Sequence, residues 1–255
     1  MITGASSGIG KELASIHAER RGDLILVARS GEKLMALKKE LEERHQVKVV
    51  VIVKDLTAPN APEEIYQEVK VAGLEVDYLI NNAGFGGYGK FYEREWKSDL
   101  AMIQLNIIVL TELSRLFLPE MVQRNHGRIL NVSSTASLPP GGPLQSVYFA
   151  TKHYVTALSY GIAGELEGSQ VTVTALLPGA TETEFAAQAG MEEAKLFANA
   201  ASAHSVARDG YEGMLAGKLD VVSGLTSSQK VMMASLPFLS KKFALQQIHQ
   251  MQSEE

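Results

Sequence analysis

The chain has 255 residues, 45% of them hydrophobic, which suits one large α/β domain or two small ones with a sizeable core. Its formal net charge of −5 gives no basic footprint for a nucleic-acid partner. The chain holds no cysteine, which excludes disulfides and thiolate metal sites, and we expect no metal site.

The first element is a glycine-rich stretch. Gly4, Gly8 and Gly10 stand at spacing G-x-x-x-G-x-G after the hydrophobic pair Met1 and Ile2. Glycine lets a backbone approach a ligand closely, and a loop that opens a helix presents free N–H groups to phosphate. The stretch predicts a pyrophosphate-binding turn, the alternative being an ordinary glycine-rich loop. Because strands average about five residues, we expect the first strand to be clipped here.

Strand and helix patterns alternate after this turn. We expect helices over 11–21, 32–45, 62–71, 96–123 and 147–166, and strands over 24–28, 47–53, 78–80, 128–132 and 171–177. This alternation predicts an α/β fold, a Rossmann-type doubly wound parallel sheet with helices on both faces, in a single domain of residues 1–255.

The pattern changes at residue 181. We expect helices over 181–201 and 202–217 and a last strand over 219–222. Residues 183–217 are assigned to substrate-side helices, and 223–255 to a C-terminal lid or interface segment.

Several polar or glycine-containing loops follow predicted strands. They are the glycine turn, Asp55 with Leu56, Asn81 to Gly84, Ser133 with Ser134, and Pro178 with Gly179. Ligands of open parallel sheets bind at the carboxyl ends of the strands, so we expect these loops to converge on one crevice.

Tyr148 and Lys152 are four residues apart on a predicted helix and share a face. An ammonium group lowers the pKa of a nearby phenol, which can then exchange a proton with an alcohol or carbonyl. A nearby serine hydroxyl can hold the substrate oxygen. Taken singly, each feature has a simpler explanation: a chance Tyr-x-x-x-Lys, a strand-end turn at Ser133 and Ser134, and a buried amide at Asn106.

In this order and spacing, the motifs resemble the short-chain dehydrogenase/reductase family. They are Thr3-Gly4-x-x-x-Gly8-Ile9-Gly10, Asp55-Leu56, Asn81-Asn82-Ala83-Gly84, Asn106, Ser134, Tyr148-x-x-x-Lys152, and Pro178-Gly179 with Thr181 and Thr183. The segment from Ser134 to Tyr148 is one residue longer than the commonest family spacing, and the first strand is clipped.

The resemblance implies four catalytic residues. Tyr148 is the expected general acid/base, and Ser134, rather than Ser133, polarises the carbonyl. Lys152 holds the nicotinamide ribose and lowers the Tyr148 pKa, and Asn106 helps hold a relay water. The implied cofactor-binding residues are Thr3, Gly4, Ser6, Ser7, Gly8, Ile9, Gly10, Arg29, Ser30, Lys33, Asp55, Leu56, Asn82, Ala83, Gly84, Tyr148, Lys152, Pro178, Gly179, Thr181 and Thr183.

The cofactor is predicted to be NADP(H). NAD-binding proteins place a carboxylate at the end of the second strand, where this chain has Ala28 followed by Arg29. A guanidinium pairs with a 2′-phosphate in bidentate fashion, and Ser30 and Lys33 are close enough in sequence to help. The alternative is that Arg29 is only a solvated charge at a strand end.

The resulting hypothesis is an NADP(H)-dependent oxidoreductase acting on a carbonyl or secondary alcohol. We expect a mid-sized apolar substrate, such as a 3-oxoacyl, steroid-like or xenobiotic carbonyl compound. Candidate pocket residues are Phe85, Tyr88, Phe91, Leu138, Leu144, Phe185, Phe197, Met232, Met233 and Phe238. The competing hypothesis is a non-catalytic dinucleotide sensor on the same fold.

The sequence also leads to expectations about cellular location and assembly. No apolar run reaches the ~18 residues of a membrane span, and no signal peptide precedes the glycine motif, so we expect a cytoplasmic protein with no membrane span. The resemblance implies a homodimer or homotetramer that uses the helices over 96–123 and 147–166.

Overall fold

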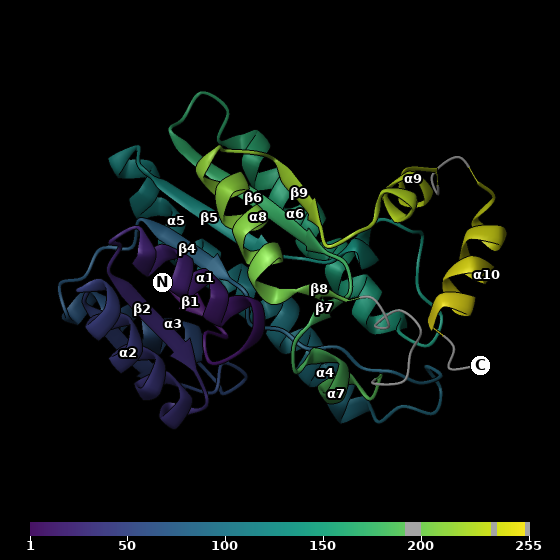
Figure 1. Ribbon diagram of the computed structural model, residues 1–255, viewed down its shortest axis with the longest axis horizontal. Helices are drawn as coiled ribbons and strands as arrows, with labels where there is room; N and C mark the ends of the chain where they lie inside the picture. Colours follow the sequence, from purple (N-terminus) through teal and green to yellow (C-terminus); the bar gives the residue numbers. More distant parts are fainter. Residues whose placement is uncertain (192–199, 236–238, 253–255) are drawn as a thin grey trace.

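The alternating sequence pattern produces a sheet of seven parallel strands in the order β3-β2-β1-β4-β5-β6-β9 (Figure 1). The computed structural model describes residues 1–191, 200–235 and 239–252. The strands are β1 (Ile2–Thr3), β2 (Leu24–Ala28), β3 (Val49–Val53), β4 (Tyr78–Asn81), β5 (Gly127–Val132), β6 (Val171–Pro178) and β9 (Asp220–Ser223). The predicted single-domain, doubly wound α/β fold is confirmed.

Helices cover both faces of this sheet. The helices of the described residues are α1 (Gly8–Glu19), α2 (Gly31–His45), α3 (Ala61–Val71), α4 (Trp96–Ile103), α5 (Leu110–Arg124), α6 (Ser146–Glu165), α7 (Phe185–Ala189), α8 (Ala203–Leu215), α9 (Ser227–Ser235) and α10 (Lys241–Gln252). A π-helical segment, Gln104–Val109, joins α4 to α5. Helices α9 and α10 lie at the opposite end of the molecule from α2 (Figure 1).

Successive residues of each buried strand point to opposite faces, which creates two cores. In β2, Leu24 and Leu26 pack into a core that includes residues of α1, α2 and α8. The intervening Ile25 and Val27 join a second core with α3 and α5. Burial on both faces explains why this strand reads as a continuous apolar run.

The region after residue 181 differs from the prediction. A helix over 181–201 is wrong for the described residues: β7 (Thr181–Glu182) pairs with β8 (Ala201–Ser202) in a small parallel sheet, and α7 covers only five residues. Residues 192–199 lie outside the described residues. The alanine-rich composition favours helix, but pairing between β7 and β8 overrides that local preference.

The long helix from Trp96 to Arg124 bears on the expected absence of a membrane span. By length and composition alone, it could cross a membrane, because isolated polar side chains do not offset its apolar content. The helix contains no uninterrupted apolar run of that length, so a search for such runs does not find it. One such helix is weak support for a membrane span, because core helices of water-soluble proteins pass the same test. Here Leu113, Phe117 and Met121 are buried in the second core, under the sheet.

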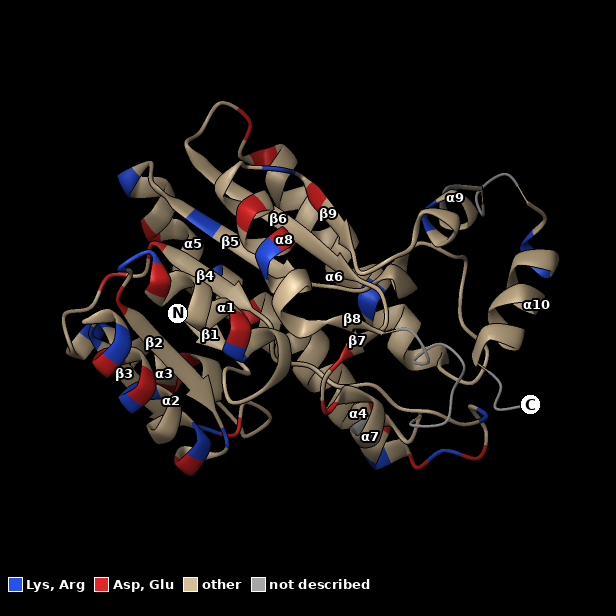
Figure 2. Ribbon diagram, viewed as in Figure 1, with Lys and Arg blue, Asp and Glu red and all other residues tan. Residues whose placement is uncertain are grey.

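Helix α2 shows how local sequence sets an element's bounds. The Ser30 hydroxyl caps its first turn by accepting a bond from Lys33 N at 3.4 Å, and Gln46 ends it in the left-handed conformation. Leu34, Leu37 and Leu41 are buried, as their spacing predicts. The charges of both signs on its outer side (Figure 2) form i,i+4 ion pairs.

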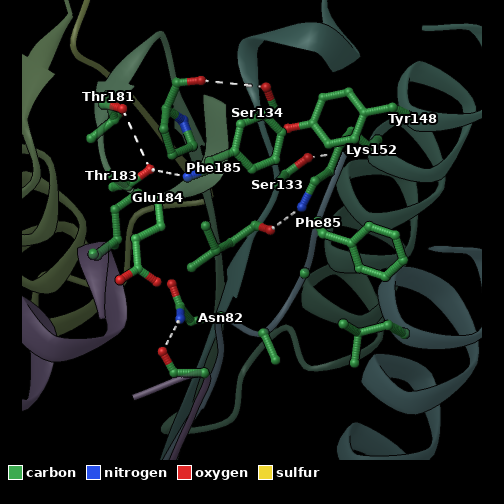
Figure 3. A pocket seen from close by; sticks show the side chains of 18 of the residues that line it. Asn82, Phe85, Ser133, Ser134, Tyr148, Lys152, Thr181, Thr183, Glu184 and Phe185 are labelled. Carbon is green, nitrogen blue, oxygen red and sulfur yellow. Dashed lines mark hydrogen bonds between the residues drawn. The ribbon is translucent and has the colours of Figure 1, made fainter. Parts of the chain in front are cut away.

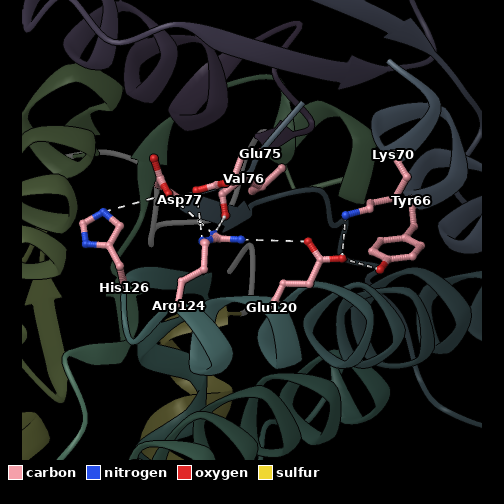
Figure 4. Close-up of polar contacts among 8 residues, drawn as sticks. All are labelled: Tyr66, Lys70, Glu75, Val76, Asp77, Glu120, Arg124 and His126. Atoms are coloured by element: carbon pink, nitrogen blue, oxygen red, sulfur yellow. Dashed lines mark hydrogen bonds and ion pairs between the residues drawn. The ribbon is translucent and has the colours of Figure 1, made fainter. Parts of the chain in front are cut away.

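At the amino ends of β4 and β5, Arg124 joins α5 to the sheet (Figure 4). Its guanidinium lies 2.9 Å from a Glu75 carboxylate oxygen and 3.5 Å from one of Asp77, and it donates to the Val76 carbonyl at 3.2 Å. Glu120, one turn earlier on α5, completes the group at 3.9 Å. Because this cluster lies at the amino ends of the strands, we assign it to stability and not to the site.

His17 lies on α1 and packs against Tyr211 of α8. Its Nδ1 lies 2.7 Å from the Tyr211 hydroxyl, and burial lowers its pKa to about 4. A side chain at Gly22 would collide with the ring, because a Cβ there would lie 2.1 Å from Nε2. His17 is therefore a packing residue.

This burial predicts an acid-sensitive stability. Between pH 6.5 and 4 the unfolded state binds a proton that native His17 does not, so the free energy of unfolding falls as pH falls through this window, by up to about 3 kcal/mol. We expect His17→Gln to weaken the pH dependence of denaturant unfolding followed by circular dichroism. His249→Gln, an exposed histidine on α10, should not. An equal pH dependence in wild type and His17→Gln would contradict the assignment.

Candidate active site

The predicted loops meet at the carboxyl edge of the sheet around one cavity of about 590 Å³. This volume lies within the range of small-molecule and cofactor sites. Twenty of the predicted site residues line it: Gly4, Ser6, Ser7, Gly8, Ile9, Arg29, Ser30, Lys33, Asp55, Leu56, Asn82, Ala83, Gly84, Ser134, Tyr148, Lys152, Pro178, Gly179, Thr181 and Thr183.

Three predicted residues, Thr3, Gly10 and Asn106, lie behind this lining. Thr3 is buried, and its hydroxyl accepts bonds from the N–H groups of Asn82 and Ala83 at 3.0 and 3.1 Å. A Cβ at Gly10 would lie 2.3 Å from the Gly4 carbonyl oxygen. Thr3 and Gly10 therefore shape the turn from behind, and a direct contact of either with the cofactor stays a prediction.

The glycine turn requires its glycines. Gly4 and Gly8 have φ of +64° and +53°, which side chains rarely adopt. A Cβ at Gly8 would also lie 2.9 Å from Thr183. Among the contacts of the described residues, none has the Ser7 hydroxyl capping the first turn of α1. The amino end of this helix therefore presents free N–H groups to the cavity.

The cavity wall beyond β2 and β3 carries charged groups. Ala28 occupies the last position of β2, and Arg29 and Lys33 line the cavity beside it. Asp55 accepts bonds from the backbone N–H and hydroxyl of Thr57 at 2.9 and 2.8 Å, which hold its pKa below the usual range. Two cations near an alanine suit a phosphate better than a ribose hydroxyl.

Ser134 and Tyr148 meet at the opposite wall (Figure 3). The Ser134 hydroxyl lies close enough to the phenol to oppose the rise of the Tyr148 pKa, and it donates to the Pro178 carbonyl at 3.4 Å. Ser133 points elsewhere, because its hydroxyl donates to the Lys152 carbonyl at 2.9 Å and lies 2.6 Å from the Thr156 hydroxyl. Within this pair, only Ser134 is placed to share a substrate oxygen with Tyr148.

Burial dominates the electrostatics of Tyr148 and Lys152. It raises the pKa of Tyr148 to about 12, against the opposing effect of the Ser134 hydrogen bond. It lowers the pKa of Lys152 to about 8. The Lys152 ammonium donates to the Val132 carbonyl at 2.9 Å and lies 5.7 Å from the Tyr148 ring centroid. The net effect on the Tyr148 pKa in this structure is therefore upward, with desolvation as its largest cause, and the expected lowering by Lys152 stays a prediction.

Asn106 lies in the π-helical segment, a distortion often found at functional sites. Its amide accepts from Phe85 N at 3.2 Å and donates to Phe85 O at 3.0 Å and to the Thr151 hydroxyl at 3.1 Å. A Cβ at Gly84 would lie 3.0 Å from Asn106 Oδ1 and 3.6 Å from Lys152 Nζ. Asn106 thus fixes the loop after β4, while Gly84 keeps the space between the amide and the ammonium open.

The substrate end of the cavity is only partly as expected. Phe85, Phe185 and Met233 line it, whereas the structure puts Tyr88, Phe91, Leu138, Leu144 and Met232 away from the lining; Phe197 and Phe238 lie outside the described residues. Sequence analysis missed further lining residues, among them Gln145, Phe149, Met191, Ile248, Met251 and Gln252. Their only sequence signal was position within the segments assigned to the substrate side and next to Tyr148.

The comparisons with known proteins agree with this geometry. The family model described as short chain dehydrogenase matches residues 1–194. Very-long-chain 3-oxoacyl-CoA reductases are similar in sequence: that of Anas platyrhynchos is 35% identical over 184 residues, and that of Homo sapiens 34% over 192. These matches cover 70% and 73% of this chain, and the chain spans only 58% and 60% of the length of those relatives.

Solved structures extend the likeness to the whole fold. A short-chain dehydrogenase from Sphingobium yanoikuyae in complex with NADPH is 31% identical, with a TM-score of 0.82 over 99% of this chain and 96% of that one. A bulky-bulky ketone specific alcohol dehydrogenase from Comamonas testosteroni is 27% identical, with a TM-score of 0.77 over 93% and 90%. With the motifs at one cavity and the family model matching 194 residues, the chain belongs to the short-chain dehydrogenase family.

Proposed function

We propose that this chain is an NADP(H)-dependent oxidoreductase that interconverts a mid-sized apolar carbonyl compound and its secondary alcohol. The observation that carries the proposal is the pair of neighbouring hydroxyls of Ser134 and Tyr148 at the wall of a cavity whose other end has a glycine turn with Arg29 and Lys33. The nicotinamide cofactor, when bound, supplies or accepts hydride. The chain's own residues bind it, orient the substrate and move the proton.

Tyr148 is the proposed acid/base. A phenol with a pKa of about 12 is protonated at neutral pH, so Tyr148 carries the proton that a carbonyl oxygen receives in the reducing direction. Ser134 donates a second hydrogen bond to the same oxygen as negative charge develops there. Lys152 binds the ribose, and the space beside Gly84 holds the water of a relay between Lys152 and Asn106.

The residues present fit a dinucleotide. Gly4 and Gly8 keep side chains out of the turn, and the amino end of α1 faces the cavity. Free N–H groups at a helix start bind phosphate, which suits the pyrophosphate. Arg29 and Lys33 line the cavity beside Ala28, and we assign them to the 2′-phosphate. Ala28 offers no competing carboxylate. The NADPH complex of a 31% identical relative adds support for NADP(H).

The lining of the substrate end supports an apolar substrate. Phe149, Phe185, Met191, Met233, Ile248 and Met251 contribute aromatic and sulfur-containing or aliphatic surface. Methionine adapts its shape to irregular apolar ligands. The names of the relatives, 3-oxoacyl-CoA reductase and bulky ketone alcohol dehydrogenase, are consistent with such a substrate.

We also propose that the chain forms a homodimer or homotetramer through α4, α6 and the π-helical segment. Trp96, Leu100, Ile108 and Tyr154 are 66%, 47%, 45% and 37% exposed. The Tyr154 hydroxyl lies 3.0 Å from that of Thr111, so α5 and α6 run close together here. Clustered exposed apolar groups are typical of interfaces between subunits.

Removal of the Tyr148 hydroxyl tests the catalytic role. We expect Tyr148→Phe to lower kcat for ketone reduction by about 10²- to 10⁴-fold while the Kd for NADPH stays nearly unchanged. Tyr92→Phe, at a residue that is 78% exposed and outside the cavity lining, is the matched control and should keep full activity. NADPH binding without turnover of any ketone by the wild type would instead favour a dinucleotide sensor.

A charge exchange at the end of β2 tests the cofactor assignment. We expect Ala28→Asp combined with Arg29→Gln to shift the ratio of NADH to NADPH affinity by about 10- to 100-fold toward NADH, because a charge-assisted bond is replaced by repulsion. Arg44→Gln on the same helix as Lys33 removes an equal charge far from the cavity and should leave the ratio unchanged. An unmoved ratio in the double variant would show the assignment to be wrong.

Sedimentation or light scattering tests the assembly. We expect the wild type at twice or four times the monomer mass and Leu100→Asp at a smaller mass, because a buried unpaired carboxylate opposes association. Val71→Asp, at a residue that is 88% exposed on α3, introduces the same charge elsewhere and should not change the mass. A monomeric wild type would contradict the proposal.

A further inference from the structure

A carboxylate lies among the groups that suit a phosphate. Glu184 follows β7, lines the cavity, and its carboxylate turns inward (Figure 3). The Lys33 ammonium donates to its Oε1 at 2.7 Å, from the far side of the cavity on α2. Lys33 above all, and to a smaller degree Ser7 directly before α1, hold the pKa of this carboxylate below its usual range. The described contacts of Glu184 thus join the glycine turn to the cation beside it.

These partners are the groups that a dinucleotide phosphate needs. The amino end of a helix and an ammonium group both favour an anion. Here the Lys33 ammonium group is paired with the chain's own carboxylate, which also lies beside Ser7. The Lys33–Glu184 pair is half exposed on both sides, so it is weak enough to exchange for another anion. The N–H group that Lys33 donates to Glu184 in this geometry is not available to a phosphate at the same time.

The next residue ties this contact to the catalytic end. The ring of Phe185 lies 5.4 Å from that of Tyr148, and Phe185 N donates to the Thr183 hydroxyl at 3.2 Å. The short segment from Thr183 to Phe185 therefore touches the glycine turn at Gly8, the cation on α2 and the ring of Tyr148. A displacement of Glu184 acts on a segment that also covers Tyr148.

We propose that the Glu184 carboxylate is an internal anion that occupies Lys33 and Ser7 in the cofactor-free protein, and that a phosphate of the dinucleotide must displace it to bind. Glu184 is thus an affinity-determining residue of the cofactor site that acts by competition. This inference rests on the proposed function for the identity of the incoming anion, but the carboxylate would compete with any phosphate at this position.

The experiment is a calorimetric titration of the full chain with NADPH, NADH and inorganic pyrophosphate at low and high salt. We expect Glu184→Gln to bind NADPH about fivefold more tightly than wild type at low salt, with a smaller gain at 0.5 M NaCl, about the concentration at which exposed ion pairs are screened. Glu182→Gln is the matched control: it removes the same charge two residues away, from a side chain outside the cavity lining, and should bind as wild type does.

A second variant distinguishes competition for Lys33 from a general effect of removing one negative charge near the cavity. In a Lys33→Met background Glu184 has lost its cation, so we expect Glu184→Gln to bring little further gain. An undiminished gain there, an equal gain in Glu182→Gln, or weaker NADPH binding by Glu184→Gln would each overturn the inference. A larger gain for NADPH than for NADH would identify the competitor as the 2′-phosphate, and equal gains would identify the pyrophosphate.

Inorganic pyrophosphate distinguishes the two ways of failing. If neither dinucleotide binds but pyrophosphate binds Glu184→Gln more tightly than wild type, the proposed function fails and the competition stands. If NADPH and pyrophosphate each bind wild type and Glu184→Gln equally, the proposed function stands and the competition fails.

Discussion

The site depends on hydrogen bonds between the ends of β1 and β4. The Asn82 amide donates to the carbonyls of Thr3 and Gly4 at 2.9 and 3.2 Å, and the Thr3 hydroxyl accepts from the N–H groups of Asn82 and Ala83. A Cβ at Gly10 would lie 2.4 Å from the Asn82 amide nitrogen. These contacts hold the glycine turn at the carboxyl edge even though β1 has only two residues. They thereby place the glycine turn beside the loop after β4, and both line the cavity.

Desolvation sets the chemistry at the other end of the cavity. Tyr148 and Lys152 are both buried, and burial alone drives both toward their neutral forms. A protonated phenol beside a lysine whose pKa has fallen to about 8 is poised to give a proton and to recover it through a neighbour. A water-filled site would leave both groups near their ordinary pKa values and remove this arrangement.

The segment after β6 connects the two ends. Thr181 donates to the Gly179 carbonyl at 2.9 Å, Thr183 packs against Gly8, and Phe185 lies against Tyr148. The strand pair of β7 with β8 holds the start of this segment in extended form. Cofactor and substrate therefore meet a common wall made by a few consecutive residues, and a change at one end reaches the other through the backbone.

Local signals in the sequence determined most of the fold and much of the site. Alternating apolar runs gave the parallel sheet, and the Gly, Asn, Ser and Tyr-x-x-x-Lys motifs marked the strand ends that converge, because parallel strands share one edge. Tertiary structure decided three matters: the β7 strand in place of a helix, the position of Thr3, Gly10 and Asn106 behind the lining, and the raised pKa of Tyr148. Each depends on contacts or burial between residues far apart in the chain. Examples are the pairing of Thr181 with Ala201 and the place of Ile248 in the cavity lining. The spacing of residues along the sequence does not encode such distances.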